Sequence, residues 1–177
     1  GLLLYGCSLI YGFTGSTNFE IISENLSETN TGAVFGIVFI IVGLAFKVSA
    51  VPFHMWTPDV YEGAATPVTA FFSVAPKAAG ISILIRFFYT VFANDSGFSS
   101  SSELLDVNWT FIIAVLSALT MTIGNILALY QQNVKRMLAY SSISHIGFML
   151  IGFCVLSYEA LASMMFYIFI YLFLFIF

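Results

Sequence analysis

The sequence predicts an all-α protein, a polytopic bundle of transmembrane helices, and three observations support this class. Of 177 residues, 60% are hydrophobic and 8% are charged, whereas soluble domains average roughly 45–50% and 25%. The mean hydropathy is +1.00, and 20 residues are phenylalanine. The apolar residues form long uncharged runs, as expected of helices that satisfy their own backbone hydrogen bonds in lipid.

The first half of the chain contains three predicted spans, since a spanning helix needs about 20 apolar residues. Residues 1–13 form the end of one span, and a polar loop with three glutamates follows. The second span covers about 33–55, and a turn at 56–66 leads to the third. The third span, about 67–93, contains a lysine and an arginine, so we expect it to pack against protein rather than lipid alone.

The second half contains up to three more spans within the same transmembrane domain, residues 1–177. A polar loop precedes the uncharged fourth span at about 109–130. The fifth span covers about 137–156, and the sixth begins at 160 and continues to 177. The chain begins with glycine and stops within an uncharged aromatic run, so we expect a partial domain: either a piece of a longer protein or one part of a split subunit whose missing helices lie on a second chain.

Charged residues outside the spans predict the orientation. Lys135 and Arg136 lie in the only cationic connector, and connectors rich in Lys and Arg stay on the inner side of the membrane. Counting spans then places the turn at 56–66 on the inner side and both acidic loops outside.

Composition also excludes several classes of protein. The formal net charge is −4 and the isoelectric point is near 4.9, so no basic patch is available for a nucleic-acid partner. Cys7 and Cys154 lie within apolar runs, where a cysteine behaves as a small hydrophobic residue. No cysteine and histidine cluster or glycine-rich phosphate loop is present. The sequence therefore predicts no metal and no cofactor in this chain.

A lysine beside a proline marks the end of the second span. Lys47 follows about fourteen uncharged residues, so its ammonium group lies too deep to reach the outer interface. Pro52, five residues later, cannot donate a backbone hydrogen bond and disrupts a helix. Lys47 and Pro52 thus predict a broken helix with a charge at the break, an arrangement that ion-translocating proteins use near the middle of the membrane.

The third span repeats this pattern with Pro76 and Lys77. Lysines that are removed from water can exchange a proton near neutral pH, and intramembrane ionisable residues are functional by default. The alternative is a static ion pair with a carboxylate of another helix or subunit. Arg86 does not release its proton at usable pH, so we assign it to charge fixing, with Asp95 as one acid able to receive it.

Further polar side chains extend a candidate polar path. His54 lies seven residues after the first lysine, nominally on the same helical face. His145 lies inside the fifth span, with Ser141 and Ser144 close to it in sequence. Each histidine is interpreted as either a proton relay or a hydrogen-bonded interior residue.

Two segments carry a resemblance to a known family. Phe46 and Lys47 followed by VSAVPFHMWTPDVYEGAATPVTAFFSVAPKAAG (residues 48–80), together with QQNVKRMLAYSSISHIGFM (residues 131–149), resemble the antiporter-like membrane subunit N family of respiratory complex I. The mitochondrial member of that family is NADH dehydrogenase subunit 2. The similarity covers nearly the whole chain and implies an antiporter-like inverted-repeat fold with broken helices, shared with Mrp-type cation/proton antiporters.

The resemblance also implies roles for individual residues. Lys47 corresponds to the lysine on the first broken helix, Lys77 to the lysine one helix on, and His145 to the polar central axis, so these three would carry protons. The chain would match the family's sixth to eleventh helices. The glutamate partner of Lys47 would then lie before Gly1, and the second broken helix after Phe177.

By the same resemblance, the protein would be a proton-translocating membrane subunit of NADH:ubiquinone oxidoreductase without a redox centre of its own. FMN, iron–sulfur clusters and ubiquinone would belong to the rest of the complex, and further antiporter-like membrane-arm subunits would be its partners. The expected location is the mitochondrial inner membrane, with the bacterial plasma membrane as the alternative.

Two other functions stay open on sequence alone. A free-standing Mrp-type antiporter subunit would need carboxylates or open carbonyls at the membrane midplane, and the nine acidic residues lie in or beside predicted loops. A structural membrane subunit would hold its lysines in static ion pairs.

Overall fold

The computed structural model describes residues 1–25, 31–91, 109–155 and 157–176, and within these residues it contains eight helices and no strand. The predicted all-α class is therefore confirmed. The helices long and apolar enough to cross a membrane are α3 (Thr31–Val48), α5 (Thr66–Val91), α6 (Trp109–Leu129) and α7 (Val134–Val155). Two further apolar helices, whose role as spans stays a prediction, are α1 (Leu2–Thr14) and α8 (Tyr158–Ile176).

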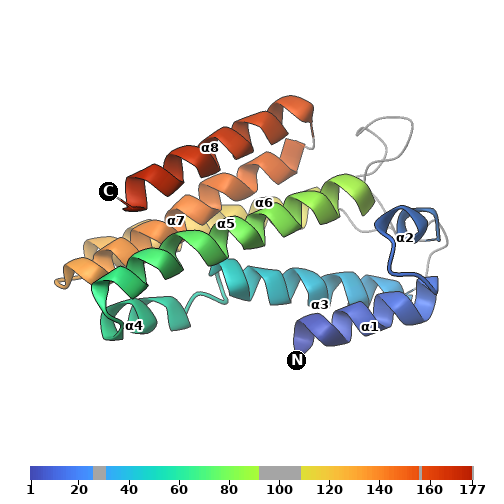
Figure 1. The fold of residues 1–177 in the computed structure, drawn as a ribbon, viewed down its shortest axis with the longest axis horizontal. Coiled ribbons are helices and arrows are strands. Elements are labelled where there is room, and N and C mark those ends of the chain that lie inside the picture. The colour runs from blue at the N-terminus through green and yellow to red at the C-terminus, as the bar shows by residue number, and fades with distance from the viewer. Residues whose placement is uncertain (26–30, 92–108, 156, 177) are drawn as a thin grey trace.

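Helix α5 lies in the middle of the bundle (Figure 1). It packs against α3 on one side and α8 on the other, and it also contacts α7. Helices α6 and α7 pack together, and α1 packs along α3. The short helices α2 (Phe19–Asn25) and α4 (Trp56–Gly63) lie at opposite ends of the long helices (Figure 1). The helix that carries Lys77 thus packs against several others, and Lys77 itself is buried among them.

Two predicted boundaries are corrected by the structure. The sequence predicts a span over 33–55 and a turn over 56–66, but α3 ends at Val48 and a helix, α4, follows the break. Pro58 lies in the first turn of α4, where a proline is tolerated because the backbone amides there have no intrahelical acceptor. The break therefore separates two helices instead of kinking one.

The polar loop predicted after the first span also contains a helix, α2. The side-chain oxygen of Asn18 accepts a hydrogen bond from the Glu20 amide at 3.1 Å, which caps the first turn. The Ser23 hydroxyl donates to the carbonyl oxygen of Val91 at 3.1 Å. This bond attaches α2 to the last turn of α5, and it satisfies a carbonyl that a helix end leaves unpaired.

Helix α3 ends in a Schellman motif immediately before Pro52. Ser49 has φ 66°, its amide donates to the Phe46 carbonyl at 3.2 Å, and the Ala50 amide donates to the Ala45 carbonyl at 2.9 Å. A side chain in this left-handed conformation costs about 1–2 kcal/mol, and glycine is the usual residue there. Helix α3 therefore ends in this turn, shortly before Pro52.

The backbone between α3 and α4 is hydrogen-bonded to neighbouring side chains. The Val51 amide donates to the Thr120 hydroxyl of α6 at 3.1 Å, and the Trp56 indole donates to the carbonyl of Phe46 at 3.1 Å. Irregular backbone at membrane depth is tolerated only where protein or water satisfies it. These two bonds allow the interruption to lie inside the bundle.

Glycines bring α1 and α3 close together. A Cβ added at Gly6 would lie 2.8 Å from the carbonyl oxygen of Gly36, whereas a Cβ at Gly12 on the same helix would meet nothing within 4 Å. Small residues at such contacts allow membrane helices to approach closely.

We expect the Gly6→Ala substitution to lower the free energy of unfolding by about 1–3 kcal/mol, because the added methyl group must push two backbones apart. The matched control, Gly12→Ala, is expected to be neutral or slightly stabilising, since alanine favours the helix. Denaturation of the full-length subunit in detergent micelles measures both, and equal stability of the two variants would contradict this packing.

Candidate functional site

Lys77 lies in the interior with a hydroxyl as its closest polar partner. It is 1% exposed, and its Nζ donates to the Ser142 hydroxyl of α7 at 2.6 Å. Ser142 in turn donates to the carbonyl of Ala139 at 2.7 Å, so its oxygen accepts from the lysine. The Tyr61 ring of α4 lies 5.4 Å from Nζ, close enough for a cation–π contact.

Lys77 has no carboxylate partner among the residues that the structure describes. The only ion pairs found there are those of Arg136, at the end of the helices that carries the cationic connector. Burying an ammonium group without a carboxylate partner costs free energy, because the interior solvates the charge poorly. Buried lysines therefore lose their proton more readily, and enzymes use such lysines as bases. The geometry is thus suited to a lysine with two charge states.

The predicted helix break at Pro76 is corrected, because α5 is continuous through it. A proline cannot donate to the carbonyl four residues earlier, which here is the carbonyl of Phe72. The Tyr61 hydroxyl donates to that carbonyl at 3.1 Å. A side chain of α4 therefore replaces the missing backbone donor, and α5 continues.

A second tyrosine supports the same turn from the other side. The Tyr171 hydroxyl of α8 donates to the Ser73 carbonyl at 2.9 Å. Tyr61 and Tyr171 together therefore hold the turn of α5 that immediately precedes Lys77. Neither tyrosine is predicted from the sequence, where the available signal is the carbonyl that a mid-helix proline leaves without a donor.

His145 lies on the same face of α7 as Ser142, three residues later, and so extends the polar cluster around Lys77. Its Nδ1 is 2.7 Å from the Tyr167 hydroxyl of α8, and its ring centroid is 5.7 Å from that of Tyr171. A pocket of about 140 Å³ adjoins the two side chains His145 and Tyr167.

The contact between α7 and Lys77 is made by Ser142, not by the predicted Ser141 or Ser144. The Ser144 backbone faces α6, because a Cβ added at Gly124 would lie 2.9 Å from the Ser144 amide nitrogen. The Ser144 hydroxyl donates to the carbonyl of Ser141 at 2.8 Å. Helical periodicity places both Ser141 and Ser142 within one turn of His145 on α7, so the spacing alone does not choose which serine meets Lys77.

Lys47 lies in the last turn of α3 and is exposed on the described part of the chain. Its stem runs beside α5, since a Cβ added at Gly80 would be 3.7 Å from the Lys47 Cγ. Gly80 lies one turn beyond Lys77. Lys47 of α3 thus lies beside the turn of α5 that follows Lys77. The described residues show no direct contact between the two lysines.

Two other predicted residues lie apart from the Lys77 cluster. His54 is 6% exposed and lies at the break, with its ring centroid 6.5 Å from that of Tyr140. Its Nδ1 has no hydrogen-bond partner among the described residues. Arg86 is exposed on α5, 6.0 Å from the Phe19 ring, and its suggested partner Asp95 falls outside the described residues.

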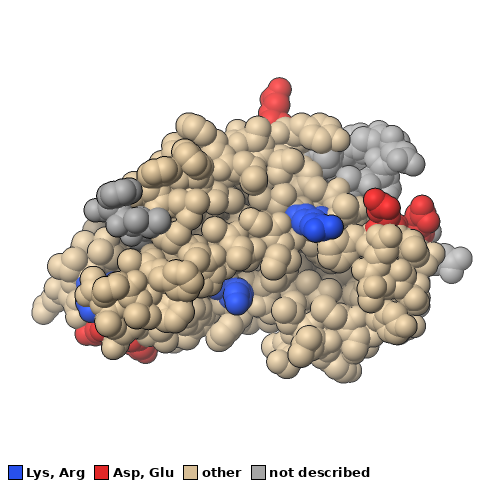
Figure 2. Space-filling view, in the orientation of Figure 1, with Lys and Arg blue, Asp and Glu red and all other residues tan. Residues whose placement is uncertain are grey.

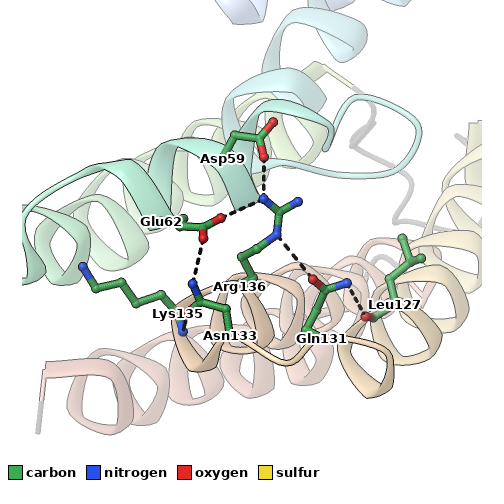
Figure 3. Close-up of polar contacts among 7 residues, drawn as sticks. All are labelled: Asp59, Glu62, Leu127, Gln131, Asn133, Lys135 and Arg136. Carbon is green, nitrogen blue, oxygen red and sulfur yellow. Dashed lines mark hydrogen bonds and ion pairs between the residues drawn. The ribbon is translucent and has the colours of Figure 1, made fainter.

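The two segments predicted on the inner side meet at one end of the bundle, as Figure 3 shows. Arg136 pairs with Asp59 and Glu62 at 2.8 Å each, and the Asn133 amide donates to Glu62 at 2.7 Å. The hydrogen bond from Arg136 holds the pKa of the Glu62 carboxyl below its usual range. Figure 2 shows few charged side chains on this face, and red and blue atoms lie next to each other at the end where α4 lies in Figure 1.

The described part of the chain offers no group of three or more His, Cys, Asp or Glu side chains that could hold a metal ion. Cys7 is exposed on α1 and Cys154 is half-buried on α7, and neither forms a disulfide.

The sequence matches a family model described as NADH:quinone oxidoreductase/Mrp antiporter, transmembrane, over residues 1–177. The chain belongs to this family. A relative from Pelagibacter ubique, NADH-quinone oxidoreductase subunit N, is 51% identical over 172 residues, which are 97% of this chain and 34% of the relative. The chain thus spans about a third of the length of the curated relatives it matches.

Solved structures of family members share the fold. A chain of the Mrp complex from Dietzia sp. is 26% identical, with a TM-score of 0.78, and the match covers 94% of this chain and 29% of that one. A chain of respiratory complex I from Thermus thermophilus with bound aureothin is 33% identical, with a TM-score of 0.70, over 98% and 35%. The predicted antiporter-like architecture is therefore confirmed.

We expect the Tyr61→Phe and Tyr171→Phe variants to lower the free energy of unfolding by about 0.5–1.5 kcal/mol each, because each removes one hydroxyl donor from a buried carbonyl. Tyr11→Phe is the control, since its hydroxyl makes no hydrogen bond within the described residues. Unfolding of the full-length subunit in micelles measures the differences. Equal stability of the three variants would mean that α5 does not need these donors.

We expect Ser142→Ala to lower the free energy of unfolding by about 1.5–3 kcal/mol, because a hydrogen bond to a charged group contributes about that much. Ser141→Ala, on the same helix, is expected to have the smaller effect. Unfolding of the full-length subunit in micelles measures both variants, and a larger loss in Ser141→Ala would contradict the contact between Ser142 and Lys77.

Proposed function

We propose that the chain is part of a proton-translocating subunit in the membrane arm of an NADH:quinone oxidoreductase. The observation that carries this proposal is Lys77, which is buried without a carboxylate partner in the described residues and is hydrogen-bonded to Ser142 beside His145. A lysine so placed can accept and release a proton, whereas a permanently charged group in the same place would be strongly disfavoured.

The relatives support this assignment. The Pelagibacter relative is named subunit N of NADH-quinone oxidoreductase, and a relative from Thermosynechococcus vestitus, 48% identical, is named NAD(P)H-quinone oxidoreductase subunit 2. The partners would be other antiporter-like membrane-arm subunits, and a chain of respiratory complex I from Thermus thermophilus shares the fold. FMN, iron–sulfur clusters and quinone would act in other parts of the complex.

Within this proposal, Lys47, Lys77 and His145 carry protons along the bundle. The break at Pro52 places Lys47 at a helix end, where segments of the full-length protein can cover its exposed side chain. Arg86 fixes charge, because it does not release its proton at usable pH. The other candidates for the polar path are His54, Ser141 and Ser144.

The Mrp-type antiporter alternative has weaker support. The match to the Dietzia Mrp complex is 26% identical, against 51% for the Pelagibacter relative. The described acidic residues lie on the short helices α2 and α4 and in the first turn of α8, not in the middle of a long spanning helix, where a coupled cation would need its ligands. The alternative of static ion pairs is disfavoured by the lack of a described carboxylate near Lys77.

The protein is a multi-pass membrane protein by its family and its four candidate spans. The sequence alone favoured the mitochondrial inner membrane over the bacterial plasma membrane. The relatives compared above are bacterial, and this supports the bacterial plasma membrane, which we propose as the location.

We expect Lys77→Ala and Lys47→Ala to depress NADH-driven proton pumping and coupled turnover while the complex still assembles. Lys77→Arg is the decisive variant, because it keeps the positive charge but cannot release its proton at usable pH. Ser82→Ala, an exposed position on the same helix, is the control. Pumping by the reconstituted complex and its subunit content measure the two properties.

The three functions give different outcomes. Proton translocation predicts a loss in both Lys77 variants, and a static ion pair predicts that Lys77→Arg is active. Wild-type pumping in assembled Lys47→Ala and Lys77→Ala would contradict the proposal. Pumping that requires sodium in the medium would favour the cation antiporter.

A further inference from the structure

Beyond its first turns, helix α8 carries tyrosines and phenylalanines on different faces. Tyr167 is half-buried and Tyr171 is buried, whereas Phe166, Phe169 and Phe173 are exposed. The two tyrosines are four residues apart, so both lie on the face of α8 that packs against α5 and α7. A hydroxyl in the interior of a membrane protein is unfavourable without a hydrogen-bond partner. The partners of these two hydroxyls therefore indicate what each tyrosine does.

One of these hydroxyls bonds to the backbone, and the other bonds to a histidine. Tyr171 donates to the Ser73 carbonyl of α5. The Tyr167 hydroxyl lies 2.7 Å from the Nδ1 atom of His145 on α7, and the two ring centroids are 6.1 Å apart. Within the described ranges this is the one hydrogen bond of the Tyr167 hydroxyl. Tyr167 thus differs from Tyr171 in bonding to a group whose charge can change.

A hydroxyl is a suitable partner for both charge states of an imidazole ring. The neutral ring has one nitrogen that donates and one that accepts, whereas both nitrogens of the charged ring donate. A carbonyl oxygen can only accept, and an ammonium group can only donate. The Tyr167 hydroxyl can donate to Nδ1 of the neutral His145 ring and accept from Nδ1 of the charged ring. His145 can therefore keep this partner when its charge changes.

A pocket of about 140 Å³ gives the Tyr167 hydroxyl room to reverse its role. His145 and Tyr167 line the pocket, together with Ile170, Tyr171 and Leu174. When the hydroxyl accepts from Nδ1, its own hydrogen needs another acceptor. The pocket is large enough for water, and a water molecule bound there supplies that acceptor.

We propose that Tyr167 is a positioning residue for His145, and that their hydrogen bond reverses its direction when the ring gains or loses a proton. On uptake, a hydronium ion in the pocket gives a proton to Nδ1 and leaves as water, while the Tyr167 O–H bond turns into the pocket. Tyr167 keeps its own proton, and release reverses each step. The inference rests on the proposed function, in which His145 carries protons, and deepens it by naming the residue that holds the ring.

The test uses the whole complex reconstituted in lipid vesicles. Tyr167→Phe removes only the hydroxyl and is expected to lower NADH-driven proton pumping about three- to tenfold, the effect of losing one hydrogen bond. Tyr11→Phe is the control, because it removes a hydroxyl from an exposed tyrosine of α1, and it is expected to pump normally. The subunit content of each complex shows whether the variant assembles.

Ring fluorination distinguishes the positioning of His145 from a role in packing alone. A tyrosine with one or two ring fluorines at position 167 keeps its hydroxyl, which becomes a stronger donor and a weaker acceptor. We expect pumping to fall stepwise with each fluorine, because the hydroxyl accepts less well from the charged ring. Phenylalanines with the same fluorines control for ring size and are expected to match Tyr167→Phe. The assays are run at a mildly acidic pH, where these phenols keep their protons.

Three results would be adverse. Wild-type pumping by assembled Tyr167→Phe would overturn the inference alone. Pumping that does not change with fluorination of Tyr167 would also overturn it, because the hydroxyl would then serve packing only; this series decides the question even if Tyr167→Phe fails to assemble. Wild-type pumping by Lys77→Ala and Lys77→Arg would instead overturn the proposed function, whatever the Tyr167 variants show.

Discussion

The structure depends on one constraint, which is that backbone donors and acceptors inside a bilayer must find partners within the protein. Two prolines, Pro52 and Pro76, challenge this constraint near the two candidate lysines. At the first, a threonine of α6 accepts the Val51 amide and the helix restarts as α4. At the second, Tyr61 donates to the carbonyl that Pro76 leaves unpaired, and α5 continues. The same residue type thus has two structural outcomes, decided by which neighbouring side chain is within reach.

The donors that satisfy the backbone also build the candidate site. Tyr61 and Tyr171 attach α4 and α8 to the turn of α5 before Lys77, and the Tyr61 ring lies against the ammonium group. Ser142 then supplies the closest oxygen from α7. Lys77 is therefore enclosed by hydroxyls and aromatic rings from three helices. Hydroxyls and aromatic rings can orient a proton without neutralising the charge of the lysine, whereas a carboxylate would neutralise it.

The two ends of the bundle differ in how they are held. At the end predicted to be inner, Arg136 pairs with two carboxylates of α4 that are partly solvent-exposed, and exposed pairs of this kind contribute little stability. Helix α4 is also held by buried hydroxyls, since Thr57 donates to the Ser49 hydroxyl and Tyr61 to the Phe72 carbonyl. At the other end, α2 is held to α5 by the hydroxyl bond from Ser23 and by the Phe19 ring, which packs against Phe87.

The sequence by itself determined the helical membrane class and the order of the long helices, because hydrophobic runs are local signals. It also singled out Lys77 as an intramembrane charge, whose role stays a prediction. It also located the interruption near Pro52. Only the tertiary structure decided that Ser142 rather than Ser141 or Ser144 meets Lys77, that α5 is continuous at Pro76, and that α4 is a helix. These outcomes depend on contacts between residues that lie far apart in sequence: 11 positions for Tyr61 and Phe72, 65 for Lys77 and Ser142. A local pattern cannot report which helix faces will meet.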